Sequence, residues 1–137
     1  MLDSDIVNEI TLPTAAGRDP DAAPPLPPLK LLRNYQEGVE LMERWLTRKG
    51  QERALRILEA GCGNKWPLRL DGVQYSLIGV DVDERALEFR RAAGRPGEEL
   101  RYGDLRERQL FAAGQFDAIY NSFVLEHVDG AAGVLEN

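Results

Sequence analysis

Apolar side chains between residues 32 and 46 recur at steps of three and four positions, which places them on one face of a helix. Gly50 follows this stretch and predicts the end of the helix. A second helical segment starts after Asp83, whose side chain can cap it, and stops at Gly94. A last helix is expected to begin near Asp129. The pattern therefore predicts three helical segments.

Four short apolar runs predict strands. They cover residues 55–60, 75–80, 99–105 and 116–123. The connection between the first two runs contains Pro67, followed by Asp71 and Gly72, so it is expected to be irregular rather than a long helix. Because strands otherwise alternate with helical segments, the pattern predicts an α/β fold with a mostly parallel sheet.

The composition is that of one soluble domain, since 43% of the 137 residues are apolar and 29% are charged. A net charge of −6 argues against binding to nucleic-acid phosphates or to an anionic membrane surface. The single cysteine, Cys62, excludes an intrachain disulfide and favours a cytoplasmic location. No apolar run is long enough to span a bilayer, and the first residues lack the pattern of a secretory signal.

Prolines are concentrated near the N-terminus, where six of the eight lie within the first 28 residues. Residues 1–29 can offer few backbone donors and bury little apolar surface, so they are predicted to form a flexible arm. The sequence PPLPP within this arm is typical of a linker, and it could also bind an aromatic groove that recognises polyproline. The folded part is predicted to begin at residue 30.

Polar residues and glycines follow each predicted strand. They are the segment Gly61-Cys62-Gly63, then Asp81, Asp104 and Asn121. The carboxyl ends of parallel strands meet at one edge of the sheet, where α/β proteins bind ligands. Glycines there let the backbone approach a ligand, and Asp81 could accept both hydroxyls of a ribose. Asp81 could instead be an acid that favours a helix N-terminus, and Asp104 could read an adenine edge or simply form a turn.

Five short motifs in this order resemble class I S-adenosylmethionine-dependent methyltransferases of the type 11-like branch. They are EAGCG at 59–63, GVD at 79–81, GDL at 103–105, FDAIYN at 116–121 and VLEHV at 124–128. The resemblance implies a Rossmann-like, mostly parallel sheet in the strand order 3-2-1-4. It also implies that residues 30–137 are the N-terminal part of a methyltransferase domain, truncated after the fourth strand.

The resemblance further implies a cofactor, S-adenosylmethionine, and an acceptor that is a small molecule or lipid-like. The residues implied to contact the cofactor are Tyr35, Glu59, Gly61, Cys62, Gly63, Asp81, Val82, Asp104, Leu105 and Asn121. In such proteins the glycine loop wraps the methionine part and the acid after the second strand holds the ribose. The pair after the third strand faces the adenine, and the residue after the fourth strand, with Ser122 as a second candidate, lies near the sulfonium.

His127 is the only histidine, and it is the candidate general base for an acceptor that must lose a proton. The favoured alternative is a packing role at the start of a helix. Together with Glu126 it would supply only two metal ligands, so no metal site is expected. Cys62 has no acid and histidine placed to activate it, so its thiol is expected to be inert.

Several bulky or charged residues have a structural interpretation. Trp66 could line the pocket, but a core position in the irregular connection is favoured. Trp45 and Phe89 lie at helical spacing and are predicted to be core residues. The pair Arg90-Arg91 is predicted to lie on a solvated helix face.

Two other functions compete with a methyltransferase. A sheet that ends at its fourth strand has an open apolar edge, so the chain could be a non-catalytic cofactor-binding remnant or an interaction module completed by a partner chain or a second copy. A dinucleotide oxidoreductase would also use Gly61, Gly63 and Asp81. Its fingerprint, however, requires a small residue where this chain has Trp66.

Overall fold

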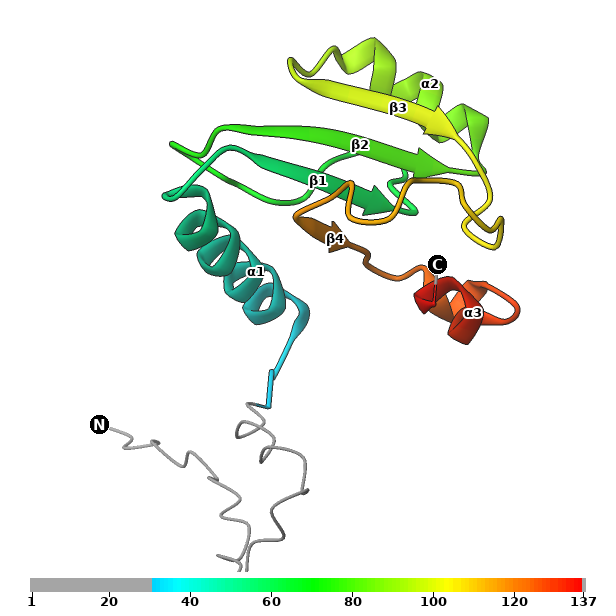
Figure 1. The fold of residues 1–137 in the computed structure, drawn as a ribbon, viewed down its shortest axis with the longest axis horizontal. Coiled ribbons are helices and arrows are strands. Elements are labelled where there is room, and N and C mark those ends of the chain that lie inside the picture. Colours follow the sequence, from blue (N-terminus) through cyan, green and yellow to red (C-terminus); the bar gives the residue numbers. More distant parts are fainter. Residues whose placement is uncertain (1–30, 137) are drawn as a thin grey trace, which may run out of the picture.

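The computed structural model describes residues 31–136. Its centre is a parallel sheet of four strands in the order β3-β2-β1-β4 (Figure 1). The strands are β1 (Leu55–Ala60), β2 (Tyr75–Asp81), β3 (Glu98–Tyr102) and β4 (Ala118–Tyr120). The predicted α/β class and strand order are confirmed. The arm predicted for residues 1–29 lies outside the described residues.

The helices follow the predicted pattern. They are α1 (Tyr35–Gly50), α2 (Glu84–Ala93), a 3-10 turn η1 (Leu125–His127) and α3 (Ala131–Leu135). The Asn34 side chain caps α1 by accepting a hydrogen bond from the Glu37 amide at 3.0 Å. Asp83 caps α2 in the same way, and Gly94 ends it with a left-handed φ of 63°. The predicted cap and stop of the second helix are therefore confirmed.

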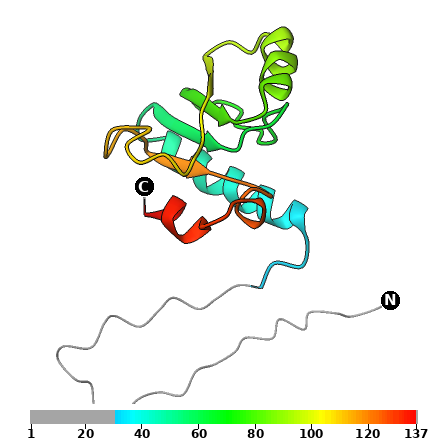
Figure 2. The same ribbon diagram turned by 90° about the vertical axis from the view of Figure 1, so that its right-hand side faces the viewer.

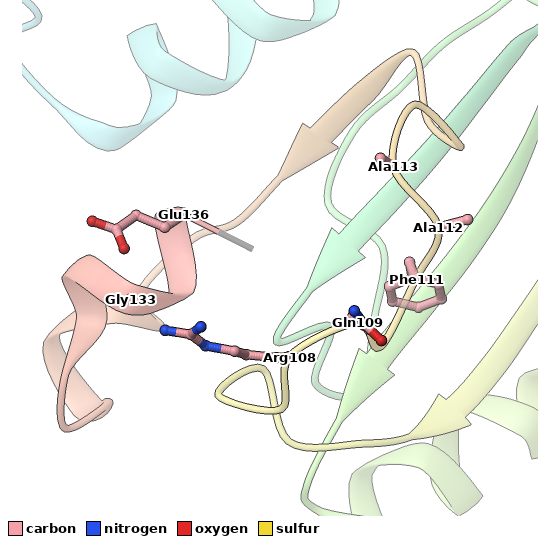
Figure 3. Close-up of a pocket in the computed structure, with 7 residues that line it drawn as sticks. All are labelled: Arg108, Gln109, Phe111, Ala112, Ala113, Gly133 and Glu136. Atoms are coloured by element: carbon pink, nitrogen blue, oxygen red, sulfur yellow. The ribbon is translucent and has the colours of Figure 1, made fainter.

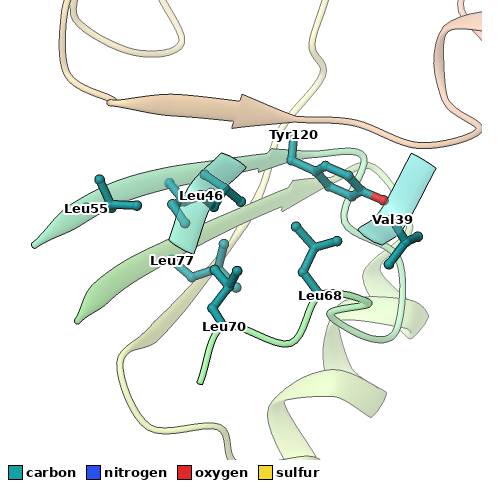
Figure 4. Packing of buried hydrophobic residues seen from close by; sticks show 8 residues of the cluster. Val39, Leu46, Leu55, Leu68, Leu70, Leu77 and Tyr120 are labelled. Carbon is teal, nitrogen blue, oxygen red and sulfur yellow. The ribbon is translucent and has the colours of Figure 1, made fainter. Parts of the chain in front are cut away.

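The two long helices, α1 and α2, lie on the same side of the sheet (Figure 2). Side chains alternate between the faces of a strand, so Ile57 and Glu59 of β1 share one face. Ile57 belongs to the cluster with α1, and Glu59 pairs with Arg90 of α2, so both helices cover this face while Leu58 and Val80 point to the other. Figure 4 shows the apolar cluster on the α1 side. Its buried members are Val39, Leu46, Leu55, Ile57, Leu68, Leu70, Leu77 and Tyr120.

The connection from β1 to β2, residues 61–74, contains no helix, as predicted. Leu68 and Leu70 are buried and contribute apolar surface to the α1 side of the sheet. Trp66 packs against the same cluster, with its ring 5.7 Å from Tyr120 in an edge-to-face arrangement. The core position favoured for Trp66 is confirmed, and Trp45 also packs against this cluster.

Two predictions for the second helix are wrong. Phe89 is 68% exposed rather than a core residue, whereas Arg90 is only 3% exposed rather than solvated. The reason is helical phase: Arg90 is three residues after the buried Leu87 and shares its face, while Phe89 is two residues after it and points away.

The last two strands differ from their predicted bounds. The third begins one residue earlier and ends at Tyr102, and the fourth is limited to three residues. Asp117 fixes the start of β4, because its carboxylate accepts a hydrogen bond from the Arg56 amide of β1 at 2.7 Å. Beyond Tyr120 the chain turns away, and Phe123 adopts a left-handed φ of 56° that a strand cannot continue. Within the described part of the chain, no helix is long and apolar enough to cross a membrane.

Candidate functional site

A cleft of about 510 Å³ lies at the carboxyl ends of the strands. Several residues predicted for the site line it: Gly61, Gly63, Asp81, Val82, Asp104, Leu105 and His127. They come from the ends of β1, β2 and β3 and from η1 after β4, so the fold brings together residues far apart in the sequence. This position is the one at which open parallel sheets bind ligands.

The glycine loop after β1 needs glycine for two different reasons. Gly61 has a φ of 73°, and a Cβ there would lie 2.3 Å from a methyl carbon of Val124, so both conformation and space exclude a side chain. Gly63 has a φ of 55°, but a Cβ there would meet no atom within 4 Å. The amides of Gly61 and Cys62 donate to the Val80 carbonyl at 2.8 and 2.9 Å. The loop is therefore held against β2 and keeps an open surface at Gly63.

Asp81, at the end of β2, has its carboxylate fixed by two backbone amides. Its Oδ2 accepts a hydrogen bond from the Gly63 amide at 2.8 Å, and its Oδ1 accepts one from the Asp83 amide at 2.9 Å. An ionised carboxylate has about four acceptor positions, so two remain for a ligand. Asp81 is thus oriented by the glycine loop and by the start of α2 while it lines the cleft.

Asp104 forms an ion pair with a cation that sequence reasoning missed. The Arg106 Nε donates to both Asp104 carboxylate oxygens, at 2.9 and 3.0 Å. These side-chain hydrogen bonds, with one from the Arg106 amide, lower the pKa of Asp104 to about 2. Both residues line the cleft, so the acid expected on the adenine side is ionised and its charge is balanced locally. Only their position two residues apart in the sequence hinted at this pair.

The segment after β4 forms an aromatic part of the cleft wall. Phe123 lines the cleft, is 68% exposed, and lies 5.3 Å from the Tyr35 ring of α1 between centroids. Tyr35 itself is not among the lining residues, nor is Asn121, which is exposed beside them. His127 lines the cleft with its side chain 77% exposed. The lining residues not predicted from the sequence are Gly103, Arg106, Phe123, Val124, Val128 and Asp129, while Ser122 was a secondary expectation.

The side chains of Glu59 and Cys62 are buried and do not line the cleft. The Glu59 side chain is 5% exposed and pairs with Arg90, whose Nη2 lies 2.7 Å from Glu59 Oε2. Burial raises the pKa of Glu59 to about 7 against the opposing effect of Arg90. Burial likewise raises the pKa of the Cys62 thiol to about 12. A protonated, buried thiol is a poor nucleophile, which agrees with the inert role predicted for Cys62.

A second hollow of about 640 Å³ lies between the connection from β3 to β4 and helix α3 (Figure 3). Residues lining it are Arg108, Gln109, Phe111, Ala112, Ala113, Gly133 and Glu136. None of them was predicted for the site, and neither the glycine loop nor Asp81 reaches it. Within residues 31–136, no group of three or more His, Cys, Asp or Glu side chains is placed to hold a metal ion. The candidate site is therefore the cleft at the strand ends.

The chain is a parallel α/β protein with a cleft at the carboxyl edge of its sheet. In a comparison with protein-family models, residues 58–137 match a methyltransferase domain of type 11. This match includes more than half of the chain, and the chain belongs to that methyltransferase family. The predicted family is confirmed. A search of curated proteins found no match.

Solved structures with the same fold are also methyltransferases. An S-adenosylmethionine-dependent methyltransferase from Mesorhizobium loti is 32% identical, with a TM-score of 0.52, over 58% of this chain and 37% of its own. Magnesium protoporphyrin IX methyltransferase from Synechocystis, solved with S-adenosylmethionine, is 21% identical, with a TM-score of 0.57, over 74% of this chain and 51% of its own. An amino pentose methyltransferase from Micromonospora echinaspora is 23% identical, with a TM-score of 0.53, over 74% of this chain and 42% of its own. The chain thus spans about half the length of these proteins or less.

Proposed function

We propose that the cleft binds S-adenosylmethionine and that the chain is the cofactor-binding part of a methyltransferase. The observation that carries this proposal is the Asp81 carboxylate, held by the Gly63 amide at 2.8 Å beside an open glycine loop. A carboxylate fixed in this way can accept both hydroxyls of a ribose. The open space at Gly63, where a Cβ would meet nothing, leaves room for the methionine part. The residues present therefore fit this cofactor.

When bound, S-adenosylmethionine would supply a methyl group on a positively charged sulfur. An acceptor attacks the methyl carbon in line with the carbon–sulfur bond, and the sulfur leaves. The role of the chain is to orient the reactants, and orientation can contribute about 7–11 kcal/mol to such a reaction. Asp81 and the glycine loop would orient the ribose and methionine parts, and Asp104 with Leu105 would face the adenine. Phe123 and Tyr35 would exclude water beside the sulfonium. His127, exposed at the cleft, would accept a proton from a hydroxyl acceptor.

The acceptor is proposed to be a small molecule, in the cytoplasm. Two structural neighbours support this class, since their names give a porphyrin and an amino pentose as acceptors. The exposed aromatic surface of Phe123 supports an acceptor with apolar or planar groups, including a lipid-like one.

Replacing Asp81 with alanine is expected to weaken binding of S-adenosylhomocysteine by about 1.5–3 kcal/mol, the range for hydrogen bonds to a charged group. The matched control is Asp83→Ala, which removes the cap of α2 and costs stability but leaves the cleft carboxylate in place. Calorimetric titration of both variants and the natural chain measures the three affinities. An NAD titration tests the oxidoreductase alternative.

Micromolar binding that Asp81→Ala weakens and Asp83→Ala preserves would support the proposal. A folded chain that binds NAD but not S-adenosylhomocysteine would contradict it. Binding without methyl transfer to any acceptor would favour a non-catalytic cofactor-binding module instead.

We also propose that β4 pairs with a further strand, from a second copy of the chain or from a partner. Among the described strands, β4 is at the edge of the sheet, and its Ile119 is 61% exposed. An apolar edge strand is a template for pairing. Sedimentation at several concentrations is expected to show a concentration-dependent dimer that Ile119→Lys reduces. A monomer at every concentration would exclude pairing between copies.

A further inference from the structure

Three charged side chains meet in the interior directly behind the glycine loop. Arg90 of α2 contacts Glu59 at the end of β1 and Glu98 at the start of β3, at 2.7 and 2.6 Å. The three side chains are 3–5% exposed, so the charges are almost completely removed from water. Buried ion pairs of this kind contribute little net stability compared with apolar residues of similar size. Their presence therefore calls for a role other than stability.

The guanidinium of Arg90 also holds the loop itself. Its Nη1 donates to the Cys62 carbonyl at 2.7 Å, while its Nε and Nη2 are used by Glu98 and Glu59. Cys62 lies between the two glycines with positive φ, and its amide is held by the Val80 carbonyl. Both sides of this residue are thus fixed, the amide by β2 and the carbonyl by Arg90.

The contacts of Cys62 determine where the next residue lies. The Gly63 amide directly follows the Cys62 carbonyl and donates to the Asp81 carboxylate in the cleft at 2.8 Å. A chain of hydrogen bonds therefore runs from Arg90 through the peptide after Cys62 to Asp81. Glu59 does not line the cleft, and its contact with this chain is through Arg90.

We propose that Arg90 is a positioning residue for the cofactor loop, and that Glu59 acts on the cofactor through Arg90 instead of by direct contact. The fork of the guanidinium supplies separate donors to two carboxylates and one carbonyl in fixed directions. A lysine would keep the charge but could not hold all three partners in this geometry. The proposal rests on the proposed function only as far as the ligand is concerned.

The test compares Arg90→Lys with a control at the opposite end of the strands. Asp117→Asn is that control. Asp117, just before β4, accepts a hydrogen bond from the Arg56 amide of β1 and lies away from the loop. Amide hydrogen exchange without ligand is expected to be at least tenfold faster at Gly61, Cys62 and Gly63 in Arg90→Lys. The affinity for S-adenosylhomocysteine is expected to fall about tenfold. In Asp117→Asn the loop exchange rates and the affinity are expected to stay within twofold of the natural chain, even if its melting temperature falls as much as that of Arg90→Lys.

Each outcome decides the question. Natural exchange rates and affinity in Arg90→Lys would overturn the proposal, and so would equal changes in the control, which would indicate only lost stability. If the natural chain does not bind S-adenosylhomocysteine, the proposed function fails, while loop exchange still decides the role of Arg90.

If Arg90→Lys does not fold, the natural chain provides the readout. Nuclear magnetic resonance of labelled arginine is expected to show slowly exchanging Nη protons for Arg90, in contact with Cys62. An averaged, rapidly exchanging guanidinium signal would overturn the proposal.

Discussion

Replacing Arg90 with leucine is expected to lower the free energy of unfolding by about 3–5 kcal/mol, the cost of removing one partner from a buried ion pair. The loss would leave Glu59 and Glu98 buried without their cation and the Cys62 carbonyl without its donor. Urea denaturation measures the change. Arg91→Leu is the matched control: the next residue of the same helix is exposed and is expected to change stability by no more than about 0.5 kcal/mol.

The same cluster predicts how stability depends on pH. The pKa of Glu59 is raised from 4.5 to about 7 by burial and by the neighbouring Glu98, while Arg90 and Arg95 lower it. The folded chain thus binds a proton that the unfolded chain has already released. This contribution is present below about pH 4.5 and is lost as the pH rises through about 7. Its size is on the order of 3 kcal/mol.

Without the guanidinium, which lowers the pKa of Glu59, this carboxyl would favour the protonated form even more strongly. The loss in Arg90→Leu is therefore expected to be larger at pH 8 than at pH 5. A loss below about 1 kcal/mol at both values would mean that the cluster is not the buried network described here.

Replacing Gly61 with alanine is expected to lower the free energy of unfolding by about 2–5 kcal/mol. A left-handed φ costs a residue with a Cβ about 1–2 kcal/mol. The new methyl group would also lie 2.3 Å from Val124, and overpacking of this kind costs about 1–3 kcal/mol. The two effects add because one concerns the backbone and the other the neighbouring side chain.

Gly63→Ala separates the two effects, since its φ is also positive but a Cβ there meets no atom within 4 Å. It is expected to cost only the conformational part. In the double variant, Val124→Ala should restore part of the stability lost in Gly61→Ala. If Gly61→Ala and Gly63→Ala cost the same, the close contact with Val124 would not exist in solution.

The parallel sheet was predictable because short apolar runs recur along the chain, each followed by a glycine, an acid or, after the fourth, an asparagine. The ends of the second helix also carried specific signals. The Asp83 side chain can cap its first turn, and Gly94 can adopt the left-handed φ that ends it. The buried Arg90 was not predicted, because a pair of arginines in a helix is usually solvated. Its phase relative to Leu87 was a usable signal, as were the acids Glu59 and Glu98 in the strands on either side of β2.

The cleft was predicted where it depends on strand ends. In the chain after β4, only Ser122 and His127 were anticipated, and the other lining residues were missed. Gly61, Gly63 and Asp81 follow from topology, since parallel strands bring their carboxyl ends together. Phe123 could not be predicted from topology, because its left-handed backbone conformation occurs at a residue other than glycine and so has no sequence signal. The pairing of Arg106 with Asp104 depends on a local turn, whose geometry composition and periodicity do not specify.

The most direct test of a cofactor site at the strand ends is a nuclear magnetic resonance titration of the labelled chain with S-adenosylhomocysteine. The account predicts that the largest shifts are those of the amides of Gly61, Gly63, Val82 and Leu105. Little change is expected at Ala112 and Gly133, which line the other hollow. Shifts confined to that hollow, or no shifts in a folded chain, would contradict the account.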